Sequence, residues 1–270
     1  MTTVLVTGGS GVVGRQVGAR LRERGAEVRV LSRRAGGEPG RVQGDLETGA
    51  GLAEAVTGVD VIVHCASAGD WLRPRRDIVQ TRNLLAAVGP ARPHIVYVSI
   101  VGVDRVRFGY YRAKLDCERM IESSGLPWTV LRATQFHELI LMFLMTLAKG
   151  PVAWTVRGFA SQPVDVGEVA DRMADLALGE PAGRVPDLGG PRAETMTDLM
   201  RQYLVATGRR KPVVRLPAFG KGVRDFRAGY HLLGPGADQG TRSFADYLRD
   251  RLTADGRIAA PYELRGRFQR

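Results

Sequence analysis

A tyrosine and a lysine four residues apart are the side chains best suited to acid–base chemistry in this sequence. Tyr110 and Lys114 lie in a stretch with helical periodicity, so they share one face of a helix. A phenol beside a fixed ammonium is a better proton donor than an isolated phenol, as the interconversion of an alcohol and a carbonyl requires. The chain has four lysines against 35 arginines, so a retained lysine indicates a specific role. The alternative is an ordinary Tyr/Lys pair on a solvated helix.

A glycine-rich turn near the start of the chain favours the chemical interpretation. It follows the apolar run 4–6 and precedes helical periodicity, and Gly9, Gly11 and Gly14 satisfy Gly-x-Gly-x-x-Gly. The first glycine permits a tight turn, the second lets the backbone approach a phosphate, and the third lets the helix pack against the strand. A tight turn without a ligand is the alternative. The residues predicted to hold a dinucleotide pyrophosphate at this helix start are Thr7, Gly8, Gly9, Ser10, Gly11, Val12, Val13 and Gly14.

Strand and helix patterns alternate along the first half of the chain. Helices are expected over 76–88 and 110–123, and strands near 4–7, 28–31, 41–43, 61–64, 94–98 and 128–131. This alternation predicts an α/β fold, a doubly wound parallel sheet with helices on both faces, which binds ligands at the carboxyl ends of its strands. We expect a dinucleotide-binding Rossmann domain over 1–150. Residues 151–270 should form a small α/β substrate lobe interleaved with the sheet edge.

The end of the second predicted strand indicates which dinucleotide is bound. An acidic side chain there would bind the ribose 2′-hydroxyl of NAD, whereas this chain has Ser32, Arg33 and Arg34. Guanidinium groups can donate paired hydrogen bonds to a 2′-phosphate. NADP is therefore the expected cofactor, and NAD the less favoured one. The alternative is that both arginines belong to the general arginine excess.

Five segments together resemble one known family. They are the glycine turn 7–14, the tripeptide 44–46, the tetrapeptide 64–67, the segment 97–102 and the Tyr110/Lys114 pair. Over most of its length the chain resembles the atypical short-chain dehydrogenase/reductases, which include NmrA-like and quinone-reductase-like proteins. The resemblance implies that Ser99 polarises the substrate carbonyl, that Tyr110 donates the proton, and that Lys114 binds the nicotinamide ribose. Tyr111 is a rival for the proton donor, but the residue four positions after it is Leu115.

Further cofactor contacts are expected just past the ends of the third, fourth and sixth predicted strands. By resemblance, Asp45 accepts a hydrogen bond from the adenine amino group, although an Asp after a strand is also an ordinary turn former. Because the carboxyl ends of parallel strands share one sheet edge, the segments after them should converge on the nicotinamide. The residues concerned are Asp45, Leu46, Cys65, Ala66, Ser67, Ala133, Thr134, Gln135 and Phe136.

These expectations describe an NADP(H)-dependent oxidoreductase. Its substrate should be a small or medium ketone, aldehyde or quinone, with hydride transfer at the nicotinamide and proton transfer at Tyr110. An NmrA-like redox sensor that binds NADP without catalysis is the alternative. Sugar-nucleotide epimerisation fits less well because the chain is short and the interval from Ser99 to Tyr110 is tight.

Composition suits a globular protein that is active as a monomer or homodimer in the cytoplasm. The chain has 270 residues, 44% of them hydrophobic, two cysteines, and no stretch before its first strand that could serve as a signal sequence. Its net charge of +11 does not favour a nucleic-acid partner, because the arginines are scattered and lack interleaved aromatics. The apolar run 139–148 is too short to cross a bilayer and predicts a buried helix. No membrane partner is expected.

The second half of the chain offers element signals and no metal site. Helices should start at Asp165 and at Thr195, and 213–216 should be a strand at the sheet edge. His137 and Glu138 lack a second histidine at position 141, so they do not form a metalloprotease helix and are interpreted as a surface dipeptide.

Overall fold

The computed structural model describes residues 1–34, 36, 39–67, 73–253 and 258–259. The chain forms two compact units, each built from three segments. The first unit comprises Met1–Asp104, Phe108–Arg132 and Val166–Pro186, and the second comprises Arg105–Arg107, Ala133–Asp165 and Asp187–Arg270.

The first unit is built on a parallel sheet. Its strand order is β3 (Arg41–Gln43), β2 (Glu27–Ser32), β1 (Thr3–Thr7), β4 (Val61–His64), β5 (His94–Ile100) and β6 (Trp128–Ala133). In the centre of the sheet, Val4 pairs with both Val28 and Val61. All residues of β1 and β4 are buried, as expected for parallel strands covered on both faces. The short β9 (Gly183–Arg184) pairs with β6.

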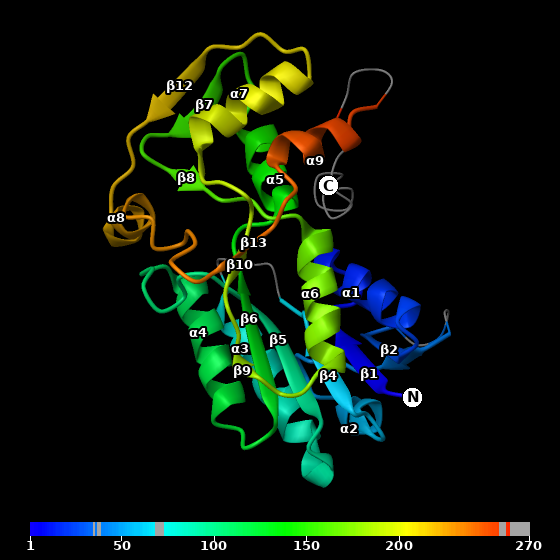
Figure 1. Ribbon diagram of the computed structural model, residues 1–270. Coiled ribbons are helices and arrows are strands. Elements are labelled where there is room, and N and C mark those ends of the chain that lie inside the picture. Colours follow the sequence, from blue (N-terminus) through cyan, green and yellow to red (C-terminus); the bar gives the residue numbers. More distant parts are fainter. Residues whose placement is uncertain (35, 37–38, 68–72, 254–257, 260–270) are drawn as a thin grey trace. The chain divides into compact units, whose positions relative to one another are not determined.

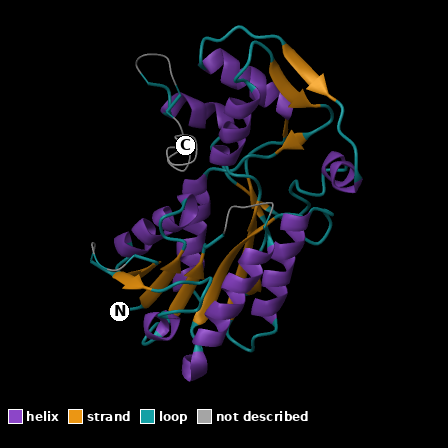
Figure 2. Cartoon of the chain, turned by 180° about the vertical axis from the view of Figure 1, so that it is seen from behind, coloured by secondary structure: helices purple, strands orange, loops and turns teal. Residues whose placement is uncertain are grey.

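Helices cover both faces of this sheet (Figures 1 and 2). The helices α1 (Val12–Glu23) and α6 (Val166–Leu178) pack together on one face. The helices α2 (Leu52–Val56), α3 (Arg75–Ala87) and α4 (Gly109–Glu122) cover the other face. A 3₁₀ turn at Gly89–Ala91 follows α3. The doubly wound parallel fold expected from the sequence is therefore confirmed. The core beneath α3 and α4 contains Leu5, Leu31, Ile62, Leu84, Ile95, Tyr97, Cys117 and Ile121.

A buried ion pair lies at the end of β6. Arg132 donates to both oxygens of Glu118 on α4, at 3.0 and 2.7 Å, and to Asp104 at 3.0 Å. Arg132 and Glu118 are almost completely buried. Burial disfavours the charged guanidinium, but its bonds to Glu118 and Asp104 still raise the pKa of Arg132 above the ordinary value.

The second unit has its own core. Apolar residues of α5 (His137–Leu147), α7 (Met196–Ala206) and α9 (Phe244–Asp250) meet there. The helix expected at 139–148 is thus present and buried, and Thr195 caps α7 as predicted. The remaining elements are β7 (Ala153–Val156), β8 (Ala160–Ser161), β10 (Leu188–Gly189), β11 (Glu194–Thr195), β12 (Val213–Leu216), α8 (Lys221–Arg227) and β13 (Asp238–Gln239).

Two sequence-based expectations for this unit were wrong. His137 and Glu138 are 0% and 6% exposed, so they are not a surface dipeptide. The His137 ring packs against Phe244 and Tyr247 and bonds the Pro163 carbonyl, and Glu138 pairs with Arg251. The strand β12 is not at the edge of the main sheet, because it pairs with β7 in a separate two-stranded sheet.

No helix in the described residues has both the length and the apolar character needed to cross a bilayer.

Candidate functional site

The glycine turn after β1 has no room for a side chain at Gly8 or at Gly14. Gly8 has φ +67°, and a Cβ there would lie 2.7 Å from the backbone of Ala66. A Cβ on Gly14 would lie 2.4 Å from the Gly8 carbonyl oxygen. Helix α1 starts immediately after Gly11 and carries no acidic side chain in its first turn, all of which is described. The exposed backbone and the positive helix end fit a pyrophosphate.

We expect Gly14→Ala to destabilise the first unit and to weaken NADPH binding. The new methyl group would push the turn away from α1, which typically costs about 1–3 kcal/mol. Urea unfolding and titration of NADPH fluorescence measure the two effects.

Gly18→Ala, in the same helix, is the matched control. Its Cβ would be 3.6 Å from the nearest atom, an ordinary contact, and alanine favours the helix. Equal behaviour of the two variants would contradict the steric argument.

A neutral histidine fixes the loop that faces the glycine turn. His64 Nδ1 lies 2.7 Å from Thr7 Oγ1, and His64 Nε2 lies 3.1 Å from Thr81 Oγ1. Because the Thr81 hydroxyl donates to the Asp77 carbonyl, Nε2 must donate to Thr81 and Nδ1 must accept from Thr7. Burial, with the nearby Lys114 ammonium, lowers the pKa of His64 to about 3, so the ring stays neutral.

The loop after β4 is thereby held against β1. The amides of Cys65 and Ala66 donate to Thr7, at 3.3 Å each. Burial raises the pKa of the Cys65 thiol to about 12 and also raises that of Cys117. Both thiols are therefore protonated and poorly nucleophilic at neutral pH.

A hydrogen-bond chain joins this loop to α4 through Tyr110. Ser67 Oγ lies 2.9 Å from Tyr110 Oη and donates to Asp77 Oδ2 at 3.0 Å. Since the Ser67 proton points to Asp77, the phenolic proton of Tyr110 points to Ser67 Oγ. Asp77 is buried on α3, and the sequence analysis gave it no role. The sequence marks Asp77 only as a single acidic residue that follows three arginines near the start of the helix after β4.

Lys114 bonds the backbone of β5 near its end, where Ser99 lies. Lys114 is buried, its Nζ donates to the Val98 carbonyl at 3.1 Å, and Nζ lies 4.3 Å from the centre of the Tyr97 ring. Ser99 is also buried, and its hydroxyl has no hydrogen-bond partner within the described part of the chain. A buried hydroxyl without a hydrogen-bond partner destabilises the free protein, and a bound ligand that forms a hydrogen bond with it would remove that cost.

The rival tyrosine is placed differently. Tyr111 is buried, and its ring packs edge-on against Phe108. The partly exposed hydroxyl in contact with the loop after β4 belongs to Tyr110.

The end of β2 presents cations to solvent. Arg33 and Arg34 are exposed, and the Arg34 amide donates to Ser32 Oγ at 3.1 Å. Asp45 accepts from the Glu47 amide at 2.8 Å, which is the ordinary turn geometry foreseen as its alternative role. Leu46 is buried in the core of the first unit.

The segment Ala133 to Phe136 lies in the second unit, where Thr134 and Gln135 bond residues of the same unit, while Gln135 Nε2 is buried without a partner in the described part of the chain. Thr134 donates to the Gln162 carbonyl at 2.5 Å, and Gln135 accepts from Ser161 at 2.8 Å. Phe136 forms a bridge with Val164. Cofactor binding by this segment therefore stays a prediction. In the described residues, no group of three or more His, Cys, Asp or Glu side chains could hold a metal ion.

Comparison with known proteins agrees with this geometry. Residues 8–138 match the model of an NAD(P)H-binding family. The chain is 30% identical to (4-alkanoyl-5-oxo-2,5-dihydrofuran-3-yl)methyl phosphate reductase of Streptomyces griseus subsp. griseus, over 76% of this chain and 74% of that protein. It is 28% identical to an uncharacterized protein of Mycobacterium tuberculosis over 67% of this chain, and spans 19% of the length of that protein.

Solved structures show the same fold. The NADPH-dependent quinone oxidoreductase of Escherichia coli, complexed with NADPH, superposes with a TM-score of 0.76. The match covers 92% of this chain and 99% of that one, at 19% identity.

Proposed function

Because the chain belongs to the atypical short-chain dehydrogenase/reductases, which bind NAD(P)H, we propose that it is an NADP(H)-dependent reductase of a small or medium ketone, aldehyde or quinone. The observation that carries this proposal is the hydrogen-bond chain from Tyr110 through Ser67 to the buried Asp77. One turn later the same helix carries the buried Lys114, which bonds the carbonyl of Val98, the residue that precedes the unpartnered Ser99. A protein that only binds a dinucleotide could use Lys114 for the ribose but has no need of the hydroxyls of Tyr110 and Ser99.

The glycine turn and the end of β2 would hold the cofactor. Backbone amides from Gly8 to Gly14 would bind the pyrophosphate, and Arg33 and Arg34 the 2′-phosphate. The bound nicotinamide supplies the hydride.

Side chains of the protein would donate the proton and stabilise the developing oxyanion. Tyr110 Oη would give its proton to the substrate oxygen, and Lys114 would bind the nicotinamide ribose. Ser99 donates its free hydroxyl hydrogen to the same oxygen. Ser67 and Asp77 keep the Tyr110 hydroxyl in place before transfer.

Oxidation of NADPH in the presence of candidate acceptors tests the proposal. The panel should include quinones, aldehydes and ketones, together with 5-oxo-2,5-dihydrofurans because the Streptomyces relative is named for reducing one. We expect NADPH consumption that depends on the acceptor. Tight NADPH binding with no consumption across the panel would favour the redox-sensor alternative.

The proposed NADP preference predicts that Arg33→Ala/Arg34→Ala weakens NADPH binding about 10- to 100-fold and leaves NADH binding unchanged. Charged hydrogen bonds of this kind contribute about 1.5–3 kcal/mol, and only NADPH offers the 2′-phosphate. Fluorescence titration of both nucleotides measures the effect.

Arg82→Ala/Arg119→Ala removes the same charge from exposed positions on α3 and α4 and is the control. Equal loss of NADPH and NADH affinity in the Arg33/Arg34 variant would refute the assignment.

A further inference from the structure

The net charge of the chain is concentrated in one part of the second unit. Residues 209–227, here called the basic segment, contain seven Lys or Arg and one acid, a net +6 of the chain's +11. That acid, Asp225, is buried and bonded to Arg107 at 2.6 Å, which leaves the exposed charge of the segment positive. Reductase chemistry in the first unit does not explain this concentration.

Large apolar side chains are exposed on and beside the basic segment. Phe219 is 85% exposed and Val205, which precedes the segment, is 80% exposed. Trp154 of β7 pairs in register with Val214 of β12, and both are exposed. Because side chains alternate along a strand, Leu216 lies on this same outer sheet face and is exposed too.

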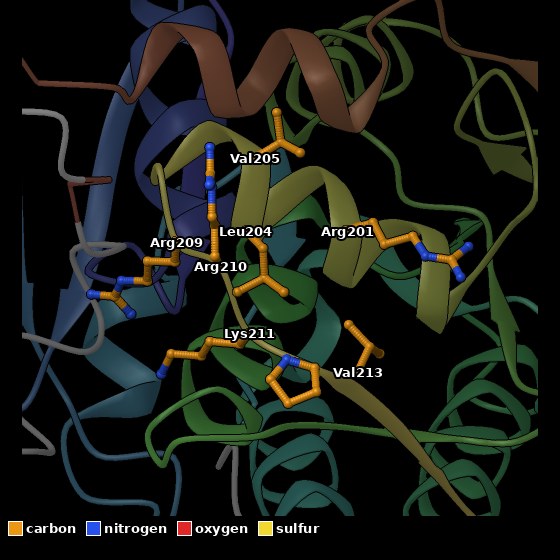
Figure 3. A pocket seen from close by; sticks show the side chains of 8 residues that line it. Arg201, Leu204, Val205, Arg209, Arg210, Lys211 and Val213 are labelled. Atoms are coloured by element: carbon orange, nitrogen blue, oxygen red, sulfur yellow. The ribbon is translucent and has the colours of Figure 1, made fainter.

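Two hollows beside the basic segment have cationic walls. The larger, of about 590 Å³, is shown in Figure 3. Arg201, Arg209, Arg210 and Lys211 surround its apolar residues. The smaller, of about 390 Å³, is lined by Lys221, Arg224, Arg227 and Phe219 among others. No acidic residue of the described chain lines either hollow.

The larger hollow has a fixed wall. Lys211 Nζ donates to the carbonyls of Ala148 and Gly150, at 2.6 Å each, and this anchors the start of the basic segment. Arg209 bonds the Tyr203 hydroxyl at 3.4 Å. Arg209 and Arg210 in this wall are exposed, and so is Arg224 beside the smaller hollow.

We propose that the basic segment, with Val205 and Trp154, docks the protein on a membrane surface that contains anionic lipids. Exposed apolar side chains ringed by cations fit the interface of such a membrane, where apolar groups enter the acyl boundary and cations reach phosphate headgroups. A nucleic acid would use the cations but not the aliphatic Val205, Val214 and Leu216. The sequence-based expectation of no membrane partner rested on the shortness of the apolar run 139–148, which concerns spanning of a bilayer and not attachment to its surface.

Sedimentation of the full chain with lipid vesicles tests the proposal. We expect binding to vesicles that contain phosphatidylglycerol, little binding to pure phosphatidylcholine, and weaker binding as salt rises. Arg210→Glu/Arg224→Glu should lower the partition coefficient at least about tenfold, because each reverses an exposed cation beside one of the two hollows. Phe219→Ser should lower it severalfold by removing the apolar contribution.

Arg82→Glu/Arg119→Glu makes the same change of net charge in the first unit and should retain most of the binding. An unchanged circular dichroism spectrum and thermal unfolding of each variant show that the second unit is folded, and unchanged NADPH affinity separates this test from the reductase assay. Absence of binding to anionic vesicles, or equal binding to both kinds of vesicle, would overturn the proposal. So would wild-type binding by Phe219→Ser together with displacement by RNA, because a purely electrostatic surface for nucleic acid behaves in that way.

Discussion

Replacement of Tyr110 by Phe should lower the turnover number for NADPH oxidation by about 10²- to 10⁴-fold, the usual contribution of a positioned acid. The variant keeps the ring but loses the hydroxyl that bonds Ser67 at 2.9 Å. Loss of that hydrogen bond costs only about 1 kcal/mol of stability, so the protein remains folded. Initial rates with a quinone acceptor, beside an NADPH titration, separate the lost proton transfer from cofactor binding, which should be unchanged.

Tyr111→Phe is the control for the neighbouring phenol. Its ring lies buried against Phe108, so removal of its hydroxyl should leave turnover near the wild-type value. Full activity in Tyr110→Phe, or loss of activity in Tyr111→Phe alone, would assign the proton transfer elsewhere.

Replacement of Arg132 by Met should lower the free energy of unfolding by about 3–5 kcal/mol, because it leaves the buried Glu118 carboxylate without its partner. The two side chains are 6% and 1% exposed, and no solvent can compensate the charge. Chemical denaturation measures the loss. The double variant Arg132→Met/Glu118→Leu removes both charges and should recover most of the stability.

Arg20→Met provides the comparison. Arg20 pairs with Asp171 at 2.9 Å, but these side chains are 30% and 47% exposed, so its loss should cost at most about 1 kcal/mol. A similar cost for Arg132→Met and Arg20→Met would mean that the Arg132 pair is effectively solvated.

Local patterns in the sequence were sufficient to predict the main sheet and the elements on which several candidate site residues lie. The glycine turn lies between β1 and α1 as expected, since glycines permit the positive φ of Gly8 and the close backbone approach at Gly14 that a side chain would prevent. The spacing of Tyr110 and Lys114 indicated one helix, and both residues are in α4. Such signals need only neighbouring residues, which a single sequence displays.

The missed features depend on contacts between distant segments. The bond from Glu138 to Arg251 joins residues 113 positions apart, so nothing near His137 and Glu138 indicated that they are buried. Ser67 and Tyr110 are hydrogen-bonded although they lie 43 positions apart in the sequence. Asp77 can accept from Ser67 only because the first turn of α3 lies beside the loop after β4. The pairing of β12 with β7 is equally remote in sequence.

The protonated state of the two native thiols has a practical consequence. Maleimide and iodoacetamide react with thiolates, so the partly exposed Cys65 and the buried Cys117, whose pKa values are both raised, should react much more slowly than an exposed cysteine. A cysteine placed at position 82 or 210 could then carry a fluorophore in the otherwise natural chain. A change in the fluorescence of the attached label would then report binding to vesicles or binding of the cofactor, and neither native cysteine would need to be replaced.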